Sequence, residues 1–231
     1  MGANYGLGMG LLMYVMPIKA DETKPWLLEK HYARRMPIIR YAFGLYENDI
    51  LVGVVTYGPT PTPQVQKYML GKGWEDKILE LNRLCIDTKT KNAASFIVGR
   101  SLAMLPKPMA VVSYADGGQG HIGYVYQSTN FLYTGAVTAH DDEYIVNGKK
   151  THARTLTSRG ITKPKEWAKA NNIEIVKAKP KHRYIYFCGN KQQKKQMLEL
   201  LSYPIINEYP KGESKRYDAG GVVQTQQVMF A

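Results

Sequence analysis

The hydrophobic and polar positions divide the chain into segments typical of an α/β protein. An apolar run near LLMYVMPI predicts a first strand, and PWLLEKHYARR at 25–35 predicts a short helix that ends at or near His31 and Tyr32. The segment YAFGLYENDILVGVVTYG predicts a hairpin, because a turn-forming group at 47–49 separates two β-rich runs. The proline-rich PTPTPQ after it predicts a loop, since proline donates no hydrogen bond to a sheet.

Two strand-to-helix units follow the hairpin. KILELNRLCID predicts a central strand, and TKTKNAASFIVGRSLAML predicts a helix whose start Asn92 or Ser95 is placed to cap. MAVVSYA predicts the next strand, and FLYTGAV another short one. Between them we expect a helix from about residue 119, with one packed face made of Ile122, Val125, Tyr126 and Thr129. This order indicates a mixed α/β sheet, in which ligands favour the carboxyl ends of the central strands.

The last third of the chain is more basic and has fewer long apolar runs. It contains EYIVNGKKTHARTLTSRG, a helical PKEWAKANN, a strand-like KHRYIYFCG and KQQKKQMLELLSY. We interpret the chain as a single domain over 1–231, with an N-terminal strand region at 1–20 and a basic C-terminal extension at 145–231. The Gly- and Gln-rich end predicts a loose tail from about residue 218.

The charge balance adds a class of partner to this picture. The chain has 31 Lys and Arg against 19 Asp and Glu, a formal net charge of +12, which attracts polyanions such as nucleic acid, a phosphorylated cofactor or anionic lipid. Its 44% hydrophobic residues argue against disorder throughout. If the polyanion is a nucleic acid, we expect largely electrostatic contacts, made by Arg34, Arg35, Lys149, Lys150, Arg154, Arg159, Lys181 and Arg183.

The cysteines and the N-terminus bear on the compartment. Cys85 and Cys188 are far apart and each lies in a strand-like run, which favours reduced core thiols and a reducing cytosol over a disulfide framework. The apolar YGLGMGLLMYVMP lacks a basic n-region and a cleavage site, and it is too short to span a bilayer. We therefore expect a soluble cytoplasmic protein with no membrane partner.

Two strand-to-helix junctions carry the candidate chemistry, KNAAS at 91–95 and ADGGQGH at 115–121. The first N–H groups of a helix are unpaired and attract phosphate, so Asn92, Ala93 and Ser95 are candidates to hold an anionic cofactor. In the second junction, Asp116 is either an N-cap or a catalytic group, and the glycines after it let the backbone approach a ligand. His121 is a candidate base or metal ligand, although no second His or Cys stands at metal-ligand spacing.

The order of these elements resembles the second half of a GNAT acyltransferase. In that fold the loop after the central strand holds the pyrophosphate of coenzyme A, and the next helix packs along the pantetheine. The resemblance implies acetyl-CoA or a related acyl donor, held with help from Tyr126 and Asn130. The common Gln/Arg-x-x-Gly-x-Gly/Ala loop is absent from this chain, and residues 91–95 occupy its place.

A more specific resemblance rests on seven motifs: HYARRMP, VGVVTYG, ELNRL, KNAAS, VSYADGGQGHIGYVYQSTNFLYTG, KHRYIYF and YPK. Together they resemble the Mom family of phage DNA-modification proteins, over roughly residues 26–211. This resemblance implies that adenine in duplex DNA is converted to its N6-methylcarbamoyl form inside the bacterial host, which protects phage DNA from restriction. Iron has been suggested for the family, and its ligands here stay unassigned. The family's important positions fall on His31, Tyr32, Arg83, Ser95, Asp116 and Tyr126.

The resemblance assigns roles that the residues can fill. An enzyme that acts on a base within a duplex flips it out, and Tyr32, Tyr114 or Tyr126 are available to stack on it. Asp116 is the preferred general base or N6 acceptor, His31 is the alternative, and Arg83 is the anion or cofactor anchor. Two other functions stay open, a coenzyme A-dependent N-acetyltransferase of a protein or small amine and a non-catalytic basic DNA-binding protein. The donor, the target sequence and the oligomeric state, a dimer included, are also open.

Overall fold

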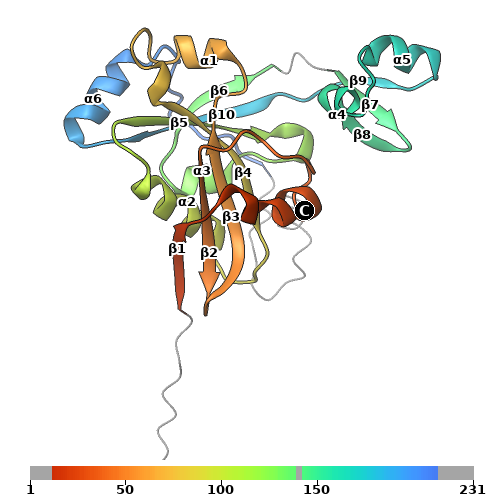
Figure 1. The fold of residues 1–231 in the computed structure, drawn as a ribbon. Helices are drawn as coiled ribbons and strands as arrows, with labels where there is room; N and C mark the ends of the chain where they lie inside the picture. Colours follow the sequence, from red (N-terminus) through yellow and green to blue (C-terminus); the bar gives the residue numbers. More distant parts are fainter. Residues whose placement is uncertain (1–11, 139–141, 213–231) are drawn as a thin grey trace, which may run out of the picture.

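The computed structural model describes residues 12–138 and 142–212, and a seven-stranded sheet forms its body (Figure 1). The strand order is β1-β2-β3-β4-β5-β10-β6. β4 and β5 are parallel, and the other neighbouring strands pair antiparallel. The predicted mixed and mostly antiparallel sheet flanked by helices is confirmed. The strands are β1 (Met13–Pro17), β2 (Tyr41–Glu47), β3 (Ile50–Gly58), β4 (Ile78–Ile86), β5 (Met109–Asp116), β6 (Leu132–Val137) and β10 (Lys181–Cys188).

Helices cover the sheet and close two apolar cores. Val54 and Val55 point to opposite faces of β3, and both are fully buried, so this half of the sheet is covered on both sides. A second core beyond β5 is centred on Ile78, Val112 and Met197. The helical elements of the body are η1 (Ala20–Thr23), η2 (Trp26–Lys30), α1 (Pro63–Tyr68), η3 (Glu75–Lys77), α2 (Ala93–Met104), η4 (Gly117–Gln119), α3 (Tyr124–Ser128) and α6 (Lys191–Leu200).

Most local predictions agree with these elements. The first strand, the hairpin of β2 and β3, β4, α2 and β5 all form where the sequence patterns place them. Asn48 and Asp49 both have positive φ, as the tight turn of that hairpin requires. The two cysteines are buried thiols in the core, as predicted. The predicted N-terminal region is described from residue 12 onward, and the tail predicted from residue 218 lies outside the described residues.

The helix expected from about residue 119 is shorter than predicted. The chain forms η4 and then a loop containing His121, and α3 begins only at Tyr124. Gly123 causes this break, because it has a φ of +85° and packs so closely on the Tyr184 ring that an added Cβ would lie 2.4 Å from it. His121 therefore lies in a loop between two helical turns, and the prediction that it lies inside a helix was wrong.

The segment predicted as a basic extension from residue 145 divides between two structures. β10 and α6 belong to the body, because β10 lies between β5 and β6 in the main sheet. Residues 142–180 form a small unit between β6 and β10, which we call the insert. It packs a three-stranded sheet and two helices around Tyr144, Leu156 and Ala168. Its elements are β7 (Asp142–Val146), β8 (Lys149–His152), α4 (Ala153–Ser158), α5 (Pro164–Ala170) and β9 (Ile175–Lys177).

The insert projects from one side of the body, at the end of the molecule opposite α6 (Figure 1). Within the described residues, no helix is long and apolar enough to cross a membrane.

The parallel strands β4 and β5 separate before they end, and this opening positions the candidate site. They pair over only three residues each, up to Glu80 opposite Val112. Beyond that point β4 continues along β3 to Ile86, and β5 continues along β10 to Asp116. We call the opening between the two carboxyl ends the fork. It occurs where α/β sheets commonly bind ligands.

Candidate active site

A β-bulge in β4 opens the fork and directs Arg83 toward it. β3 pairs Thr56 with Arg83 and Tyr57 with Leu81, which leaves Asn82 unpaired in the ladder. The Asn82 side chain is held instead by Thr56 and by the carbonyl of Ile38, at 2.6 and 3.1 Å. The ELNRL motif is therefore a bulge with an arginine after it.

Arg83 presents an unsatisfied donor inside the protein. One terminal nitrogen donates to the carbonyl of Asn82 at 2.6 Å, while its Nε is buried without a partner among the described residues. Burial lowers the pKa of Arg83, and Arg35 adds to that effect. A buried guanidinium N–H with no acceptor is costly, so the Nε of Arg83 is a donor that can bind an anionic or carbonyl group.

His31 and Tyr32 lie together at the end of η2, beside the fork. Their rings stack with centroids 4.5 Å apart, and the Tyr32 ring meets the edge of His121 at 6.1 Å. His31 is 4% exposed, and burial together with nearby Arg83 lowers its pKa to about 3. Tyr32 is 39% exposed, but burial of its hydroxyl group, followed by the charge of Asp116, raises its pKa.

The hydrogen bonding of His31 restricts its chemical role. Its Nδ1 accepts the backbone N–H of Ala33 at 3.1 Å. A neutral imidazole with an acceptor Nδ1 carries its proton on Nε2, so both nitrogens are committed. His31 therefore acts as a neutral donor or as packing support, and it is poorly placed to accept a proton.

Asp116 ends β5 and fixes the turn that follows. Its Oδ1 accepts the N–H of Gly118 at 2.8 Å, and its Oδ2 lies 3.9 Å from the ammonium of Lys181. The carboxylate also raises the pKa of His121, although burial has the larger effect and lowers it. Asp116 is therefore the N-cap of η4 by geometry. Its negative charge also raises the pKa values of Tyr32 and His121.

Of the glycines after Asp116, Gly117 is required by packing, whereas Gly120 has open space around it and a φ of +74°. A Cβ on Gly117 would lie 2.4 Å from the carbonyl oxygen of Pro180, so the chain entering β10 requires glycine at 117.

The Nε2 of His121, at the end of this turn, is buried without a partner in the described structure. Arg83 and His121 therefore bring two unsatisfied donors or acceptors to the same site.

Tyr126 reaches the site from α3. Its ring packs on Phe131 and Tyr184 with centroids 5.3 Å away in each case. Burial raises its pKa to about 12 against the lowering effect of a hydrogen bond with Ser113. The Ser113 hydroxyl in turn donates to the carbonyl of Leu81 at 3.1 Å, across the point where the strands separate.

Glu80 is a site residue that the sequence analysis missed. It is the last paired residue of β4 before the fork, and burial raises its pKa to about 7. Four cations oppose that rise, Arg83 most strongly, followed by Lys181, Arg154 and Arg35. The sequence shows only a glutamate between two leucines of a strand. It does not indicate that Glu80 is buried, because this depends on how β4 and β5 meet at the fork. A carboxyl that titrates near neutral pH is a candidate proton acceptor.

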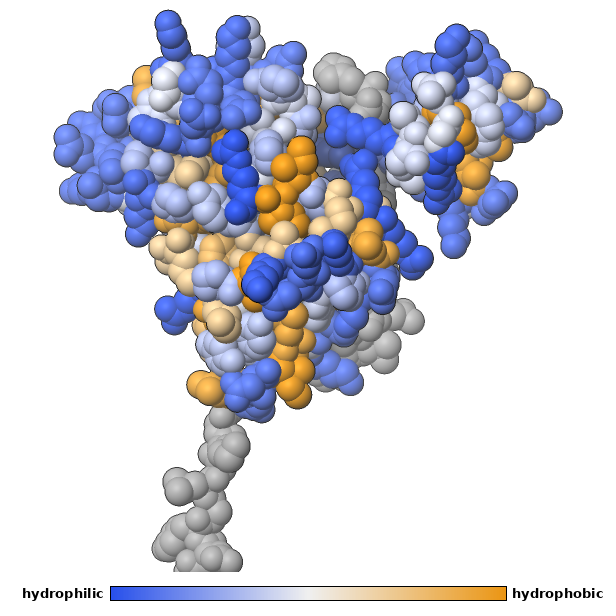
Figure 2. Space-filling model, viewed as in Figure 1, coloured by the Kyte–Doolittle hydropathy of each residue, from blue (hydrophilic) through white to orange (hydrophobic). Residues whose placement is uncertain are grey.

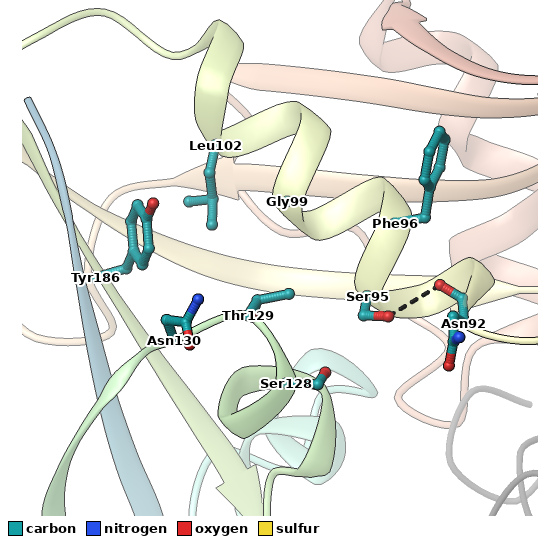
Figure 3. Close-up of a pocket in the computed structure, with 9 residues that line it drawn as sticks. All are labelled: Asn92, Ser95, Phe96, Gly99, Leu102, Ser128, Thr129, Asn130 and Tyr186. Carbon is teal, nitrogen blue, oxygen red and sulfur yellow. Dashed lines mark hydrogen bonds between the residues drawn. The ribbon is translucent and has the colours of Figure 1, made fainter.

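A cavity beside α2 brings together three predicted cofactor residues, Asn92, Ser95 and Asn130 (Figure 3). It lies between α2, from its N-cap Asn92 to Leu102 in its last turn, and the residues at and just after the carboxyl end of α3. Asn92 adopts a left-handed conformation at the N-cap without a side-chain capping bond. The other residues that line the cavity are Phe96, Gly99, Leu102, Ser128, Thr129 and Tyr186.

The first turn of α2 leaves its backbone donors available. The Ser95 hydroxyl donates back to the carbonyl of Asn92 at 3.0 Å, so it does not cap the helix. Within the described residues, no carbonyl or side chain accepts from the N–H groups of Ala94 and Ser95. The buried Ala93 contributes backbone only. This turn has the donor arrangement that binds an anion.

Two predicted residues are engaged elsewhere in the structure. Tyr114 packs toward the second core, where burial and then Tyr203 raise its pKa, so it lies apart from Tyr32 and Tyr126. Arg183 stacks on Tyr203 at 3.4 Å from the ring centroid and donates to Thr134 through Nε at 2.8 Å. Two of its three guanidinium nitrogens thus donate to Thr134, and its contact with DNA stays a prediction.

The metal suggested by the resemblance does not fit the residues present. Over 12–138 and 142–212, no group of three or more His, Cys, Asp or Glu side chains could hold a metal ion. His31 could ligate through Nε2 only by placing a proton on Nδ1, which already accepts the Ala33 N–H. We therefore assign no chemical step to iron.

Comparison with known proteins supplies the family. The profile of the Mom protein family matches residues 12–207, which is most of the chain. The chain belongs to the Mom protein family. It is 28% identical over 213 residues to the protein named methylcarbamoylase mom of Escherichia phage Mu, with 84% of each chain covered.

Two solved structures of acetyltransferases are less similar to this chain in sequence. An N-acetyltransferase from Staphylococcus aureus Mu50 matches with a TM-score of 0.45 and 14% identity, covering 77% of this chain and 99% of the other. A spermidine N-acetyltransferase from Vibrio cholerae, in complex with CoA and spermine, matches with a TM-score of 0.44 and 7% identity. That match covers 80% of this chain and 98% of the other.

Proposed function

We propose that this protein is a transferase that modifies the N6 position of adenine in double-stranded DNA to the methylcarbamoyl form. The observation that carries the proposal is the meeting of His31, Tyr32, Arg83, Asp116 and Tyr126 around one fork, from four separate segments. Membership of the Mom family and similarity to a protein named methylcarbamoylase support the reaction. In a phage, such a modification would protect DNA from restriction in the host cytoplasm.

The aromatic and acidic residues suggest how a flipped adenine is held. Tyr32 offers an exposed ring next to the fork, supported from behind by buried His31, so we assign it to stacking on the base. The adenine N6 is a weak nucleophile, because its lone pair is delocalised into the ring. When N6 bonds to the transferred carbon and the donor's leaving group departs, N6 releases one proton. We assign that proton to Asp116, with Glu80 as the other carboxyl in reach of the fork.

The cavity between α2 and α3 is the proposed donor site. The available N–H groups of Ala94 and Ser95 suit a phosphate or carboxylate, as in acetyl-CoA or a related acyl donor. For a methylcarbamoyl product, the transferred acyl group must already carry the methylamino nitrogen, because acetyl-CoA itself would give N6-acetyladenine. The unsatisfied Nε of Arg83 suits an anionic or carbonyl group at the reacting end.

Mass spectrometry of nucleosides tests the proposal directly. DNA from bacteria that express the wild-type protein should contain a deoxyadenosine heavier by one methylcarbamoyl group, and DNA from cells with an empty vector should not. Acetyl transfer from acetyl-CoA to a small amine, without any DNA product, would instead support an N-acetyltransferase. Duplex binding without either product would identify a non-catalytic DNA-binding protein.

A further inference from the structure

The insert joins the body at the rim of the proposed active site. It leaves the sheet after Val137 and returns at Lys181, and these two residues are paired with each other across β6 and β10. Lys181 is also paired with Asp116 across β10 and β5. On the insert itself, an oxygen of Glu143 lies 3.6 Å from the position that a Cβ on Gly118 would occupy. The base of the insert is therefore adjacent to Asp116 and its turn.

The insert has an excess of positive charge on an ordered framework. Residues 142–180 contain nine Lys and Arg against four Asp and Glu. Three of those acids are already paired within the insert, Asp142 with Lys165, Glu143 with Lys150 and Glu166 with Lys163. Figure 2 shows hydrophilic side chains over much of its surface. The remaining cations are Lys149, Arg154, Arg159, Lys169, Lys177 and Lys179.

One of these cations reaches toward the site, while others point to solvent. Arg154, at the start of α4, lies close enough to Glu80 to lower the pKa of Glu80. Arg35, far from Arg154 in the sequence, has the same effect. Lys149 follows the tight turn at Asn147 and Gly148, and Arg159 ends α4, and both are exposed. A duplex lying across the fork near Glu80 would therefore meet cations both from the insert and from the loop after η2.

We propose that the insert is the arm that binds duplex DNA, contacting the phosphates beside the target adenine through β8 and α4. This inference rests on the proposed function for its choice of DNA as the partner. Phosphate contacts of this type carry no sequence information, but they fix where the duplex lies relative to the fork. The charge of α6 at the far end of the molecule is then solvated surface without a role in binding (Figure 1).

Two double variants with the same change of charge test this division. Lys149→Gln with Arg159→Gln removes two positive charges from the insert, and Lys191→Gln with Lys195→Gln removes two from α6. All four residues are exposed, so both variants should fold, and thermal unfolding checks this. Lys150 is kept because its partner Glu143, at 3.6 Å, lies against the turn at Gly118, whereas Lys195 pairs with Glu199 at 3.9 Å only on the exposed surface of α6.

The readout is the affinity for a short DNA duplex, measured at several salt concentrations. The insert variant should bind more weakly, and the slope of log K against log[salt] should decrease by about 1 to 2, because about 0.9 is lost per phosphate contact. The α6 variant should keep the wild-type slope. Equal losses in the two variants, or an unchanged insert variant, would overturn the proposal. So would an insert variant that loses binding to phosphatidylserine vesicles and keeps its binding to the duplex.

The experiments distinguish a failure of the proposed function from a failure of the proposed DNA-binding arm. If wild-type protein forms no modified adenine but the insert variant loses duplex binding, the proposed function fails and the binding arm stands. If wild-type protein modifies DNA and the insert variant binds like the wild type, the binding arm alone is wrong.

Discussion

The imidazole of His31 stacks on the phenol ring of Tyr32, with planes 28° apart. Consecutive residues in an α-helix point about 100° apart and would not share a site. Here η2 ends at His31, whose φ of −72° and ψ of 136° are those of extended chain. The end of the helix thus allows one ring to be buried as support while the other is presented to the fork.

This pair predicts that the ring of Tyr32 matters more than its hydroxyl. Tyr32→Phe should keep most of the modification rate at low DNA concentration, because the stacking surface is retained. Tyr32→Ala should lose about 1 to 3 kcal/mol of stacking, or roughly 5- to 150-fold in rate. The rate is measured as modified deoxyadenosine formed per unit time.

Tyr124→Ala is the matched control for Tyr32→Ala. Tyr124 is 37% exposed, close to the 39% of Tyr32, but it lies on α3 with its hydroxyl toward Gly212. Its removal should leave the rate unchanged. If Tyr32→Phe is as slow as Tyr32→Ala, the hydroxyl carries the function and the stacking role is wrong.

Asp116→Asn should separate the capping role of Asp116 from its charge. In the wild type, the Gly118 nitrogen lies 2.8 Å from Oδ1 of Asp116. The amide oxygen of asparagine can accept the same N–H, so the turn should persist. We expect a folded protein that binds duplex DNA at least as well as the wild type and forms little or no modified adenine. Nucleoside mass spectrometry and duplex titration measure the two properties.

Asp142→Asn provides the control, since Asp142 also pairs with a lysine, Lys165 at 2.8 Å, but lies on the insert. This variant should modify DNA normally. If Asp116→Asn retained the wild-type rate, Asp116 would be a structural cap. Glu80 would then be the next candidate base, ahead of His31, because Nδ1 of His31 is already engaged by Ala33.

The local elements could be predicted from sequence because each is determined by neighbouring residues. The hairpin turn at Asn48 and Asp49 and the apolar alternation of β5 are examples. The position of β10 between β5 and β6 could not, because it depends on pairing across the whole insert. The burial of Glu80 could not be predicted either, because it depends on where β4 and β5 separate in the folded sheet. The partners of Arg183 were not visible in the sequence for a related reason, since Tyr203 and Thr134 meet it only in the folded chain.

The cavity between α2 and α3 predicts how Ser95 and Gly99 respond to substitution. Ser95→Leu and Gly99→Leu should each weaken the binding of acetyl-CoA at least tenfold, because both side chains would project into the cavity (Figure 3). Binding of duplex DNA should not change. Titration calorimetry with acetyl-CoA and with a short duplex measures both.

Gly99→Ala is the control for the cavity. A Cβ at this position has nothing within 4 Å, so the variant should bind acetyl-CoA normally and gain stability from the better helix former. If the leucine variants bind acetyl-CoA like the wild type, the cavity is not the donor site. If the wild-type protein does not bind acetyl-CoA, the donor is of another class.

His31 and Glu80 should have opposite effects on stability between about pH 5 and 6. Burial lowers the pKa of His31 to about 3, so between that value and about 6.5 the unfolded chain takes up a proton that the folded chain does not. Stability from this group is present above pH 6.5 and decreases as the pH falls. Burial raises the pKa of Glu80 to about 7, so between about 4.5 and 7 the folded chain holds the extra proton. Stability from Glu80 is present below pH 4.5 and is lost as the pH rises through 7.

The two slopes are each about 1.4 kcal/mol per pH unit and cancel where they overlap. Glu80→Gln should therefore lose about 1.4 kcal/mol more than the wild type when the pH is lowered from 6 to 5, because the His31 slope is no longer offset. His31→Gln should instead gain a similar amount relative to the wild type over the same step. Neither group is among the causes of the other's pKa shift, so each variant reports on the remaining residue. Urea unfolding at the two pH values measures the differences, and Glu80→Gln curves parallel to those of the wild type would show that Glu80 is not buried as described.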